Sequence, residues 1–335
     1  MKYARISLSA MAVLALVAIP SLSTQDANDM KQRIDSKFNE VKAGNDAKLK
    51  KLQDEINSMR EEVKKKGLTF QVDITEQMKM KIADITGSKP PPKPTPTPAP
   101  PVTPDTPPAP VPSGDVRAKC NPSAEAFDWR DHGIVSPVRN QGSCGDCYLF
   151  AAMGAYESAY VIHNKQSPDL AEQFMLNCSK QFGCNGGWHG TVWNEMKKTK
   201  VDIEPNYPYQ AKKGVCKFSQ VPGDYRVQEL GYVKAEKNGI PDPQAIKNAL
   251  CSYGVLATSV LVTRMFSGYK SGVFNEGARG TTNHAINIVG WDNSKRAWLI
   301  RNSWGEWWGD KGYMWIEWGS NSVGSGTMWV EPVKQ

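Results

Sequence analysis

Apolar and polar positions follow one pattern in the first part of the chain and different ones further on. Residues 27–66 are highly charged, and their sparse apolar positions recur at steps of three and four: Leu49, Leu52, Ile56, Met59 and Val63. These steps are the a/d spacing of one helical face. Because the seam lasts only about two heptads, the pattern predicts a single amphipathic helix that packs on a partner surface, with a coiled coil as the alternative.

Residues 68–74 alternate between apolar and polar positions, which is typical of a strand. A proline-rich stretch follows, since residues 89–113 contain 13 of the 23 prolines. Such a stretch is extended and polyproline-like and cannot form a core. At about 3.1 Å per residue it reaches roughly 75 Å. That length allows residues 27–88 either to fold back over the next domain or to stay away from it.

From Cys120 on, the pattern is that of a globular domain. Residues 147–163 are apolar on nearly all sides, which predicts a central buried helix. After Gly231, β-rich stretches alternate with glycine turns: 255–262, 285–291, 297–301 and 312–317. A helical first half and a β-rich second half predict an α+β domain of two lobes, with a site in the cleft between them.

Composition separates the same two regions. All seven cysteines and all eleven tryptophans lie at or after Cys120, so the first third lacks the residues of a dense core. The net charge of +7 is concentrated there too: residues 1–119 hold 19 Lys and Arg against 14 Asp and Glu, whereas the remainder holds 22 against 20. The nearly neutral C-terminal domain has no basic footprint for nucleic acid.

Residues 1–23 have the pattern of a secretory signal peptide. Lys2 and Arg5 precede an uncharged, mostly apolar run that ends at Pro20, and small residues follow. The alternative is an uncleaved membrane anchor, but the run is shorter than the roughly 20 residues of a spanning helix. We therefore expect a secreted, periplasmic or extracellular protein, in a compartment where disulfides persist.

The chemistry is concentrated in residues 141–148, which contain the pair Cys144 and Cys147. Cys147 lies where a glycine loop meets the predicted helix, and the positive end of a helix favours a thiolate. His284 could share the thiol proton. Asn302 could orient the imidazole, and Gln141 could donate an N–H to an oxyanion.

These residue types allow two other interpretations. A redox pair of Cys144 and Cys147 would require a thioredoxin-like βαβ context, which the pattern lacks. A zinc site built from Cys178, Cys184 and His189 is possible by residue type, but export favours disulfides. We expect no metal and no cofactor.

This constellation resembles the papain/cathepsin family of cysteine proteases, whose local signature is Cys-Gly-Ser/Ala-Cys-Trp/Tyr with a distant His and Asn. The resemblance covers residues 127–333 and rests on five ordered motifs: 128–130, 141–148, 183–187, 302–305 and 308–313. Asp146 departs from this pattern, because it stands in place of the small residue, and Tyr148 takes the place more often held by Trp.

The resemblance implies a role for each matching residue. Cys147 would be the nucleophile, His284 the acid and base, Asn302 the orienting residue and Gln141 the oxyanion donor. The implied substrate-binding residues are Gly187, which pairs with an extended substrate, His189, Asn283, Trp304, which shields the Asn–His contact, and Trp308 on the leaving-group side. His189, with Met328 or Trp329 and a residue near Thr258, would line the specificity pocket.

Seven cysteines leave at least one thiol unpaired. With Cys147 as the free thiol, the resemblance implies the pairs Cys144–Cys184 and Cys178–Cys216. Cys120 and Cys251 are then left over, and we hypothesise that they pair and staple the start of the domain to the second lobe.

The combined interpretation is a secreted papain-like endopeptidase made as a precursor. Its segments would be a signal peptide (1–23), a pro-region (24–88), a proline-rich linker (89–114) and the peptidase domain (115–335). The pro-region lacks the Glu-Arg-Phe-Asn pattern of many relatives, yet residues 68–86 are the part expected to occupy the cleft and inhibit. Protein or peptide substrates and the pro-region itself are the expected partners; the sequence leaves the oligomeric state unknown.

Three alternatives to this interpretation follow. A non-catalytic binding module with the same fold would normally lack one of Cys147, His284 and Asn302, and all three are present. An exopeptidase would need an inserted loop that blocks one end of the cleft, and no long insertion is evident. Residues 27–113 could also be a permanent stalk instead of a removable pro-region.

Overall fold

The computed structural model describes residues 24–90, 115–217, 225–233 and 239–333. The expected signal peptide at 1–23 and nearly all of the expected linker lie outside these residues. The chain divides into two compact units, Met1–Asp54 and Glu55–Gln335. In the first unit the described residues belong to helix α1 (Thr24–Lys66), which continues into the second unit.

The C-terminal part of α1 shows why the helix forms and where it stops. Ile56 and Met59, two positions of the predicted apolar face, are buried. Three lysines occupy the last turn, where cations complement the helix dipole. Gly67 then adopts a left-handed conformation with φ of 63°, and the Leu68 N–H bonds to the Val63 carbonyl at 3.0 Å. A glycine in this conformation is a common helix terminator.

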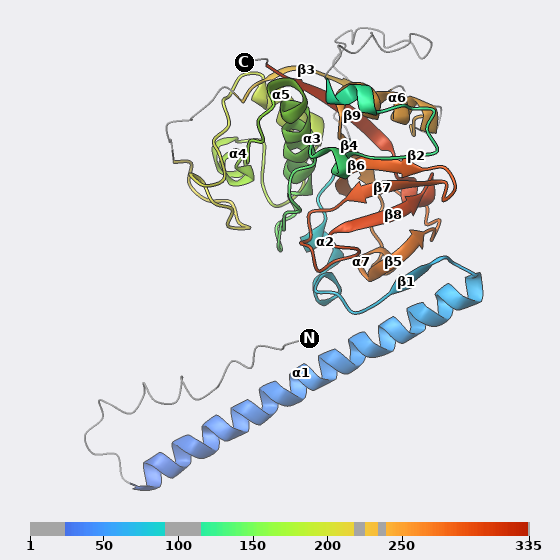
Figure 1. Cartoon of the computed structure of the whole chain (residues 1–335). Coiled ribbons are helices and arrows are strands. Elements are labelled where there is room, and N and C mark those ends of the chain that lie inside the picture. The colour runs from blue at the N-terminus through green and yellow to red at the C-terminus, as the bar shows by residue number, and fades with distance from the viewer. Residues whose placement is uncertain (1–23, 91–114, 218–224, 234–238, 334–335) are drawn as a thin grey trace. The chain divides into compact units, whose positions relative to one another are not determined.

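The second unit is built around one mixed sheet (Figure 1). Its strand order is β1-β5-β8-β7-β6-β4-β9-β3, and β2 pairs with β6. All pairings are antiparallel except that of β5 with β8. The strands are β1 (Phe70–Val72), β2 (Ala126–Asp128), β3 (Val227–Tyr232), β4 (Leu256–Val260), β5 (Tyr269–Phe274), β6 (His284–Asp292), β7 (Ala297–Arg301), β8 (Tyr313–Glu317) and β9 (Ser325–Pro332).

Helices α3, α4 and α5 lie to one side of this sheet and form the other lobe (Figure 1). The long helix predicted at 147–163 is α3, which is buried along nearly its whole length and packs against β6 and β9. The helices after α1 are α2 (Ile82–Ile85), α3 (Cys147–Asn164), α4 (Glu172–Cys178), α5 (His189–Met196), α6 (Pro243–Tyr253) and α7 (Arg264–Ser267). The short 3₁₀ helices are η2 (Gln77–Lys79), η3 (Val116–Lys119), η4 (Trp129–His132) and η5 (Ser320–Ser322).

The predicted α+β architecture with two lobes is confirmed, and each predicted β-rich stretch contains a strand. Every residue of β4, β6 and β7 is buried, so these three strands form the core of the sheet. The strand predicted at 68–74 is also present as β1. It is shorter, with Phe70 and Val72 buried and Gln71 exposed. Among the described residues, no helix combines the length and apolar character needed to cross a membrane.

Residues 68–90 belong to the second unit and contact both of its lobes. β1 pairs with β5 at one edge of the sheet, and the chain then passes through η2 and α2. Ser88 finally forms a parallel β-bridge with Gly187, in the loop before α5. This segment, residues 68–90, is called the crossing segment below, because it runs from the outer edge of the sheet to the helical lobe.

Candidate active site

Cys147 is the first residue of α3 and is buried. The loop before it is fixed by the Cys144–Cys184 disulfide and by a 3.0 Å hydrogen bond from the Gly145 N–H to the Cys184 carbonyl. The Ala285 N–H donates to the Cys147 sulfur at 3.3 Å. The sulfur therefore lies between the start of α3 and the start of β6, where the two lobes meet.

His284 opens β6 and forms a hydrogen bond with Asn302, which follows β7. His284 Nε2 and Asn302 Oδ1 are 2.8 Å apart. Trp304 covers this pair, with its rings centred 4.8 Å from the imidazole. Within the described residues, His284 Nδ1 makes no hydrogen bond, so that nitrogen is free to exchange a proton with another group.

Burial dominates the electrostatics of both groups. It raises the pKa of Cys147 to about 12, against smaller opposing effects from the N–H groups of Ala285 and Gly87. It lowers the pKa of His284 to about 4, although the Asn302 hydrogen bond acts in the opposite direction. Because desolvation penalises charged forms, thiol and imidazole are both neutral at pH 7 in this arrangement.

Gln141 is held from both sides of its amide. Its Nε2 donates to the Cys144 carbonyl at 2.8 Å, and its Oε1 accepts from the Ser303 hydroxyl at 2.7 Å. A side-chain amide nitrogen carries two hydrogens, so one N–H stays available for a further acceptor. Ser303 lies in the 302–305 motif, but the sequence alone assigned it no role.

The crossing segment passes directly over Cys147. The N–H groups of Gly87 and Ser88 both donate to the Asn283 carbonyl at 2.8 Å, and Gly187 exchanges backbone bonds of 2.8 Å with Gly87 and Lys89. A Cβ on Gly87 would lie 1.9 Å from the Gly145 carbonyl oxygen. Only glycine allows so close an approach. Two expected substrate-binding residues, Gly187 and Asn283, are thus occupied by the chain itself.

Trp304 also binds the crossing segment through two hydrogen bonds. Its indole N–H donates to the Ile85 carbonyl at 3.0 Å, and its own carbonyl accepts from Gln77 Nε2 at 3.1 Å. The hydroxyls of Ser88 and Ser259 are 2.9 Å apart.

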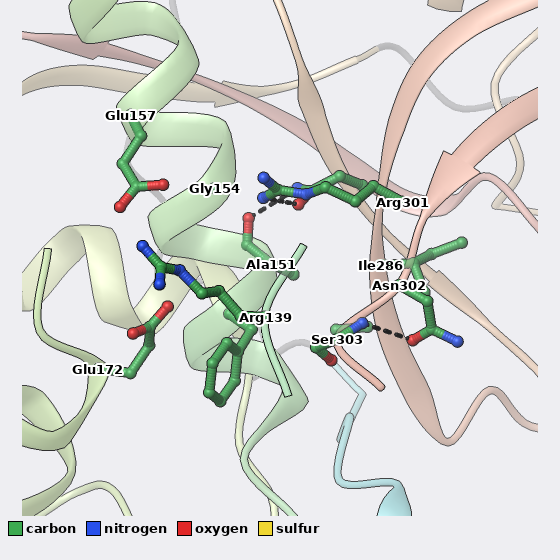
Figure 2. Close-up of a pocket in the computed structure, with 12 residues that line it drawn as sticks. Arg139, Ala151, Gly154, Glu157, Glu172, Ile286, Arg301, Asn302 and Ser303 are labelled. Atoms are coloured by element: carbon green, nitrogen blue, oxygen red, sulfur yellow. Dashed lines mark hydrogen bonds between the residues drawn. The ribbon is translucent and has the colours of Figure 1, made fainter. Parts of the chain in front are cut away.

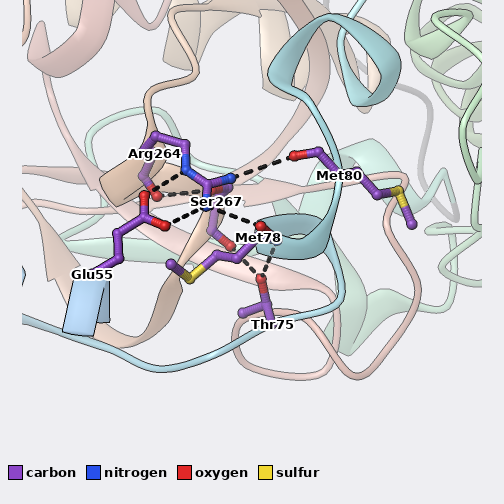
Figure 3. A network of polar contacts seen from close by, with 6 residues as sticks. All are labelled: Glu55, Thr75, Met78, Met80, Arg264 and Ser267. Atoms are coloured by element: carbon purple, nitrogen blue, oxygen red, sulfur yellow. Dashed lines mark hydrogen bonds and ion pairs between the residues drawn. The ribbon is translucent and has the colours of Figure 1, made fainter. Parts of the chain in front are cut away.

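A second set of contacts anchors the crossing segment to α7 (Figure 3). Arg264 forms two hydrogen bonds of 2.7 Å with the Glu55 carboxylate and one of 2.9 Å with the Met78 carbonyl. The Thr75 hydroxyl donates to the Ser267 carbonyl at 2.7 Å. A bidentate Arg–carboxylate pair is more directional than an ordinary surface ion pair, so Glu55 of α1 and the turn at η2 are tied to one side chain.

A buried polar cluster lies behind the site (Figure 2). Arg301, the residue before Asn302, donates to the Ser136 carbonyl at 2.6 Å and to Asn287 Oδ1 at 2.8 Å. A Cβ on Gly154 of α3 would lie 1.4 Å from the Arg301 guanidinium, so a larger residue there would displace this side chain from its hydrogen bonds. These contacts fix the end of β7 and thereby the backbone that carries Asn302.

The remaining expected substrate-binding and pocket residues are also buried. His189 is fully buried, its Nε2 is 3.1 Å from the Gly326 carbonyl, and burial lowers its pKa to about 3. Trp308 is buried and donates to the Ser267 carbonyl at 3.1 Å. The Thr258 and Thr327 hydroxyls, on the paired strands β4 and β9, are 2.9 Å apart. Met328 and Trp329, on β9, are buried.

The seven cysteines all lie in described residues. Three disulfides join them as Cys120–Cys251, Cys144–Cys184 and Cys178–Cys216, and Cys147 alone is free. The alternative pairing of Cys144 with Cys147 and a zinc site using Cys178 and Cys184 are both excluded by these bonds. In the described part of the chain, no cluster of three metal-ligating side chains exists.

The sequence is similar to those of known cysteine proteases. The profile described as papain family cysteine protease matches residues 123–333. Cysteine proteinase 2 from Zea mays is 36% identical over 228 residues, covering 65% of this chain and 62% of that protein. The chain thus matches about three-fifths of that relative's length.

Two precursor structures share the fold over a longer range. A recombinant stem bromelain precursor has a TM-score of 0.67 at 26% identity, covering 90% of this chain and 99% of that one. Digestive procathepsin L 3 of Tenebrio molitor larval midgut has a TM-score of 0.67 at 21% identity, covering 84% and 89%. The architecture is therefore papain-like. Since the family profile matches more than half of the sequence, this chain belongs to the papain family of cysteine proteases.

Proposed function

We propose that this protein is a cysteine endopeptidase that hydrolyses peptide bonds with Cys147 as nucleophile. The observation that carries the proposal is the free Cys147 thiol at the start of α3, hydrogen-bonded by Ala285, next to the His284–Asn302 pair at 2.8 Å. Nucleophile, base and orienting group are the three parts that covalent acyl transfer needs.

The reaction follows from these atoms. His284 Nδ1 takes the Cys147 proton, and the sulfur attacks the scissile carbonyl carbon. The resulting oxyanion accepts hydrogen bonds from Gln141 Nε2 and from the backbone N–H of Cys147. That backbone N–H has no intrahelical partner, because Cys147 is at the start of a helix. The imidazolium returns its proton to the leaving amine, which gives a thioester, and water then releases the acid. Asn302 Oδ1 holds the Nε2–H throughout.

We further propose that residues 24–88 form a pro-region that inhibits the enzyme. Gly87 and Ser88 occupy the backbone groups of Gly187 and Asn283 that an extended substrate would need. The burial that accompanies this cover keeps Cys147 and His284 neutral. Removal of the crossing segment would admit solvent and lower the cost of a thiolate–imidazolium pair.

Export completes the proposal and rests on the signal-like sequence of residues 1–23. N-terminal sequencing of the exported protein tests export and processing together. A terminus between residues 89 and 120 supports a removable pro-region. A terminus near residue 24 on fully active enzyme would support a permanent stalk instead.

Labelling with a thiol-directed epoxide tests the nucleophile. The active form of the wild-type protein should take up one equivalent and lose its peptidase activity. Cys147→Ala should take up none and show no activity above background, whereas Ser143→Ala, in the same loop, should label normally. Persistent labelling or cleavage by Cys147→Ala would falsify the proposed function.

A further inference from the structure

Asp146 is a buried acid that the proposed reaction does not use. It directly precedes Cys147 at the N-cap of α3, but its side chain makes no capping hydrogen bond. The side chain is fully buried, and within the described residues Oδ1 has no hydrogen-bond partner. A carboxylate at a helix start is normally stabilised by the helix N–H groups, so a carboxyl turned away from them needs another explanation.

The hydrogen bonds of Tyr209 supply that explanation. Its hydroxyl oxygen is 2.7 Å from Asp146 Oδ2 and 3.0 Å from the Gln141 carbonyl oxygen. A phenol has one hydrogen, and both neighbours would be acceptors if Asp146 were ionised. The two bonds can coexist only when Asp146 carries a proton, donates it to Tyr209, and Tyr209 donates to Gln141.

We propose that Asp146 is a positioning residue that works as a neutral carboxylic acid, linking Cys147's own loop through Tyr209 to the backbone of the oxyanion donor Gln141. This role rests on the proposed function. The protonated form also explains Oδ1, because an unpaired carbonyl oxygen costs less to bury than an unpaired charge. The chain of bonds runs Asp146 O–H to Tyr209, then Tyr209 O–H to Gln141.

The electrostatic surroundings agree with a neutral acid. Burial raises the pKa of Asp146 to about 8, although the Tyr209 bond acts in the opposite direction. The titratable groups that face it are Tyr209, with Glu172 of α4 acting on that phenol, and Cys147 and Tyr148 on α3. An ionised Asp146 raises the pKa of Cys147, which opposes the thiolate needed for attack.

Loss of the proton at alkaline pH then has two consequences. Tyr209 must turn its only hydrogen toward Asp146, so the Gln141 carbonyl loses the hydrogen bond from Tyr209. A negative charge also appears one residue before the nucleophile. Both changes lower kcat/KM, and neither occurs when residue 146 cannot ionise.

The experiment compares kcat/KM from pH 6 to pH 9.5 for the active form of wild type and Asp146→Asn, with active sites counted by epoxide titration. The Asn amide can still donate to Tyr209 and stays neutral. We expect the ratio of variant to wild type to rise at least threefold between pH 7 and pH 9. Asp131→Asn, at an exposed acid in η4, is the matched control and should give a flat ratio.

A flat ratio for Asp146→Asn would overturn the proposal while leaving a Cys147-dependent activity, and thus the proposed function, intact. If the Asn variant does not fold, Asp146→Ser provides the same test, since Ser also cannot ionise. Tyr209→Phe removes the link at every pH. It should reduce kcat at pH 7 about three- to tenfold with KM within twofold, and an unchanged kcat would also contradict the proposal.

Discussion

Individual side chains around Cys147 are held by neighbours that are themselves buried. Gln141 is clamped between the Cys144 carbonyl and Ser303, and Asn302 follows the anchored Arg301. Pre-organised donors of this kind stabilise charge without reorganisation during the reaction. The amide of Gln141 is therefore the side chain whose loss isolates one step of the proposed chemistry.

We expect Gln141→Ala to lower kcat by about 10²–10³, or about 3–4 kcal/mol of transition-state stabilisation, because one oxyanion donor disappears. KM should change little, since the oxyanion exists only after attack. Steady-state kinetics with a peptide substrate measure both constants. Gln181→Ala, at an exposed position, is the matched control, and a Gln141 variant with kcat within threefold of wild type would exclude the donor role.

Whole elements bring these side chains together, and here the sequence and the structure can be compared. The sequence motifs predicted Cys147, His284, Asn302 and Gln141 as site residues, because residue type and spacing alone indicate their chemical roles. The spacing of apolar residues also predicted α3 and the central strands. The Asp146–Tyr209–Gln141 chain could not be found this way, since Tyr209 is 63 residues from Asp146 and belongs to no motif. Such contacts depend on packing across elements.

The crossing segment makes a very close backbone approach to the loop before Cys147 at Gly87. A methyl group on Gly87 would collide with the Gly145 carbonyl at 1.9 Å, and backbone cannot move as a flexible side chain would. We expect Gly87→Ala to displace the segment from Cys147. In the full-length protein at neutral pH, epoxide labelling should become at least tenfold faster than in wild type.

Gly44→Ala is the matched control for this prediction, because its added Cβ meets no described atom within 4 Å beyond the adjacent residues and backbone of its own helix. It should label at the wild-type rate. Equal labelling rates for Gly87→Ala and wild type would mean that the backbone contacts with Gly187 and Asn283 do not limit access to the thiol.

Two disulfides of the second unit close chain loops of very different length. Cys120–Cys251 spans 131 residues and joins the residue after η3 to α6, whereas Cys178–Cys216 spans 38 and lies beside α4. The sequence could indicate the first pair only by what was left over. In physical terms this bond connects the start of the globular domain to the helix that packs behind β9.

Loop entropy gives these two disulfides different contributions to the free energy of unfolding. In the chain-entropy treatment a 131-residue loop contributes about 5 kcal/mol and a 38-residue loop about 4 kcal/mol. Denaturant unfolding of the Cys120→Ala/Cys251→Ala and Cys178→Ala/Cys216→Ala double variants measures both losses. We expect the first variant to be the less stable by about 1 kcal/mol, with epoxide labelling of Cys147 retained after activation. The reverse order would show that local packing around Cys178, and not restriction of the unfolded chain, determines how much each disulfide stabilises the domain.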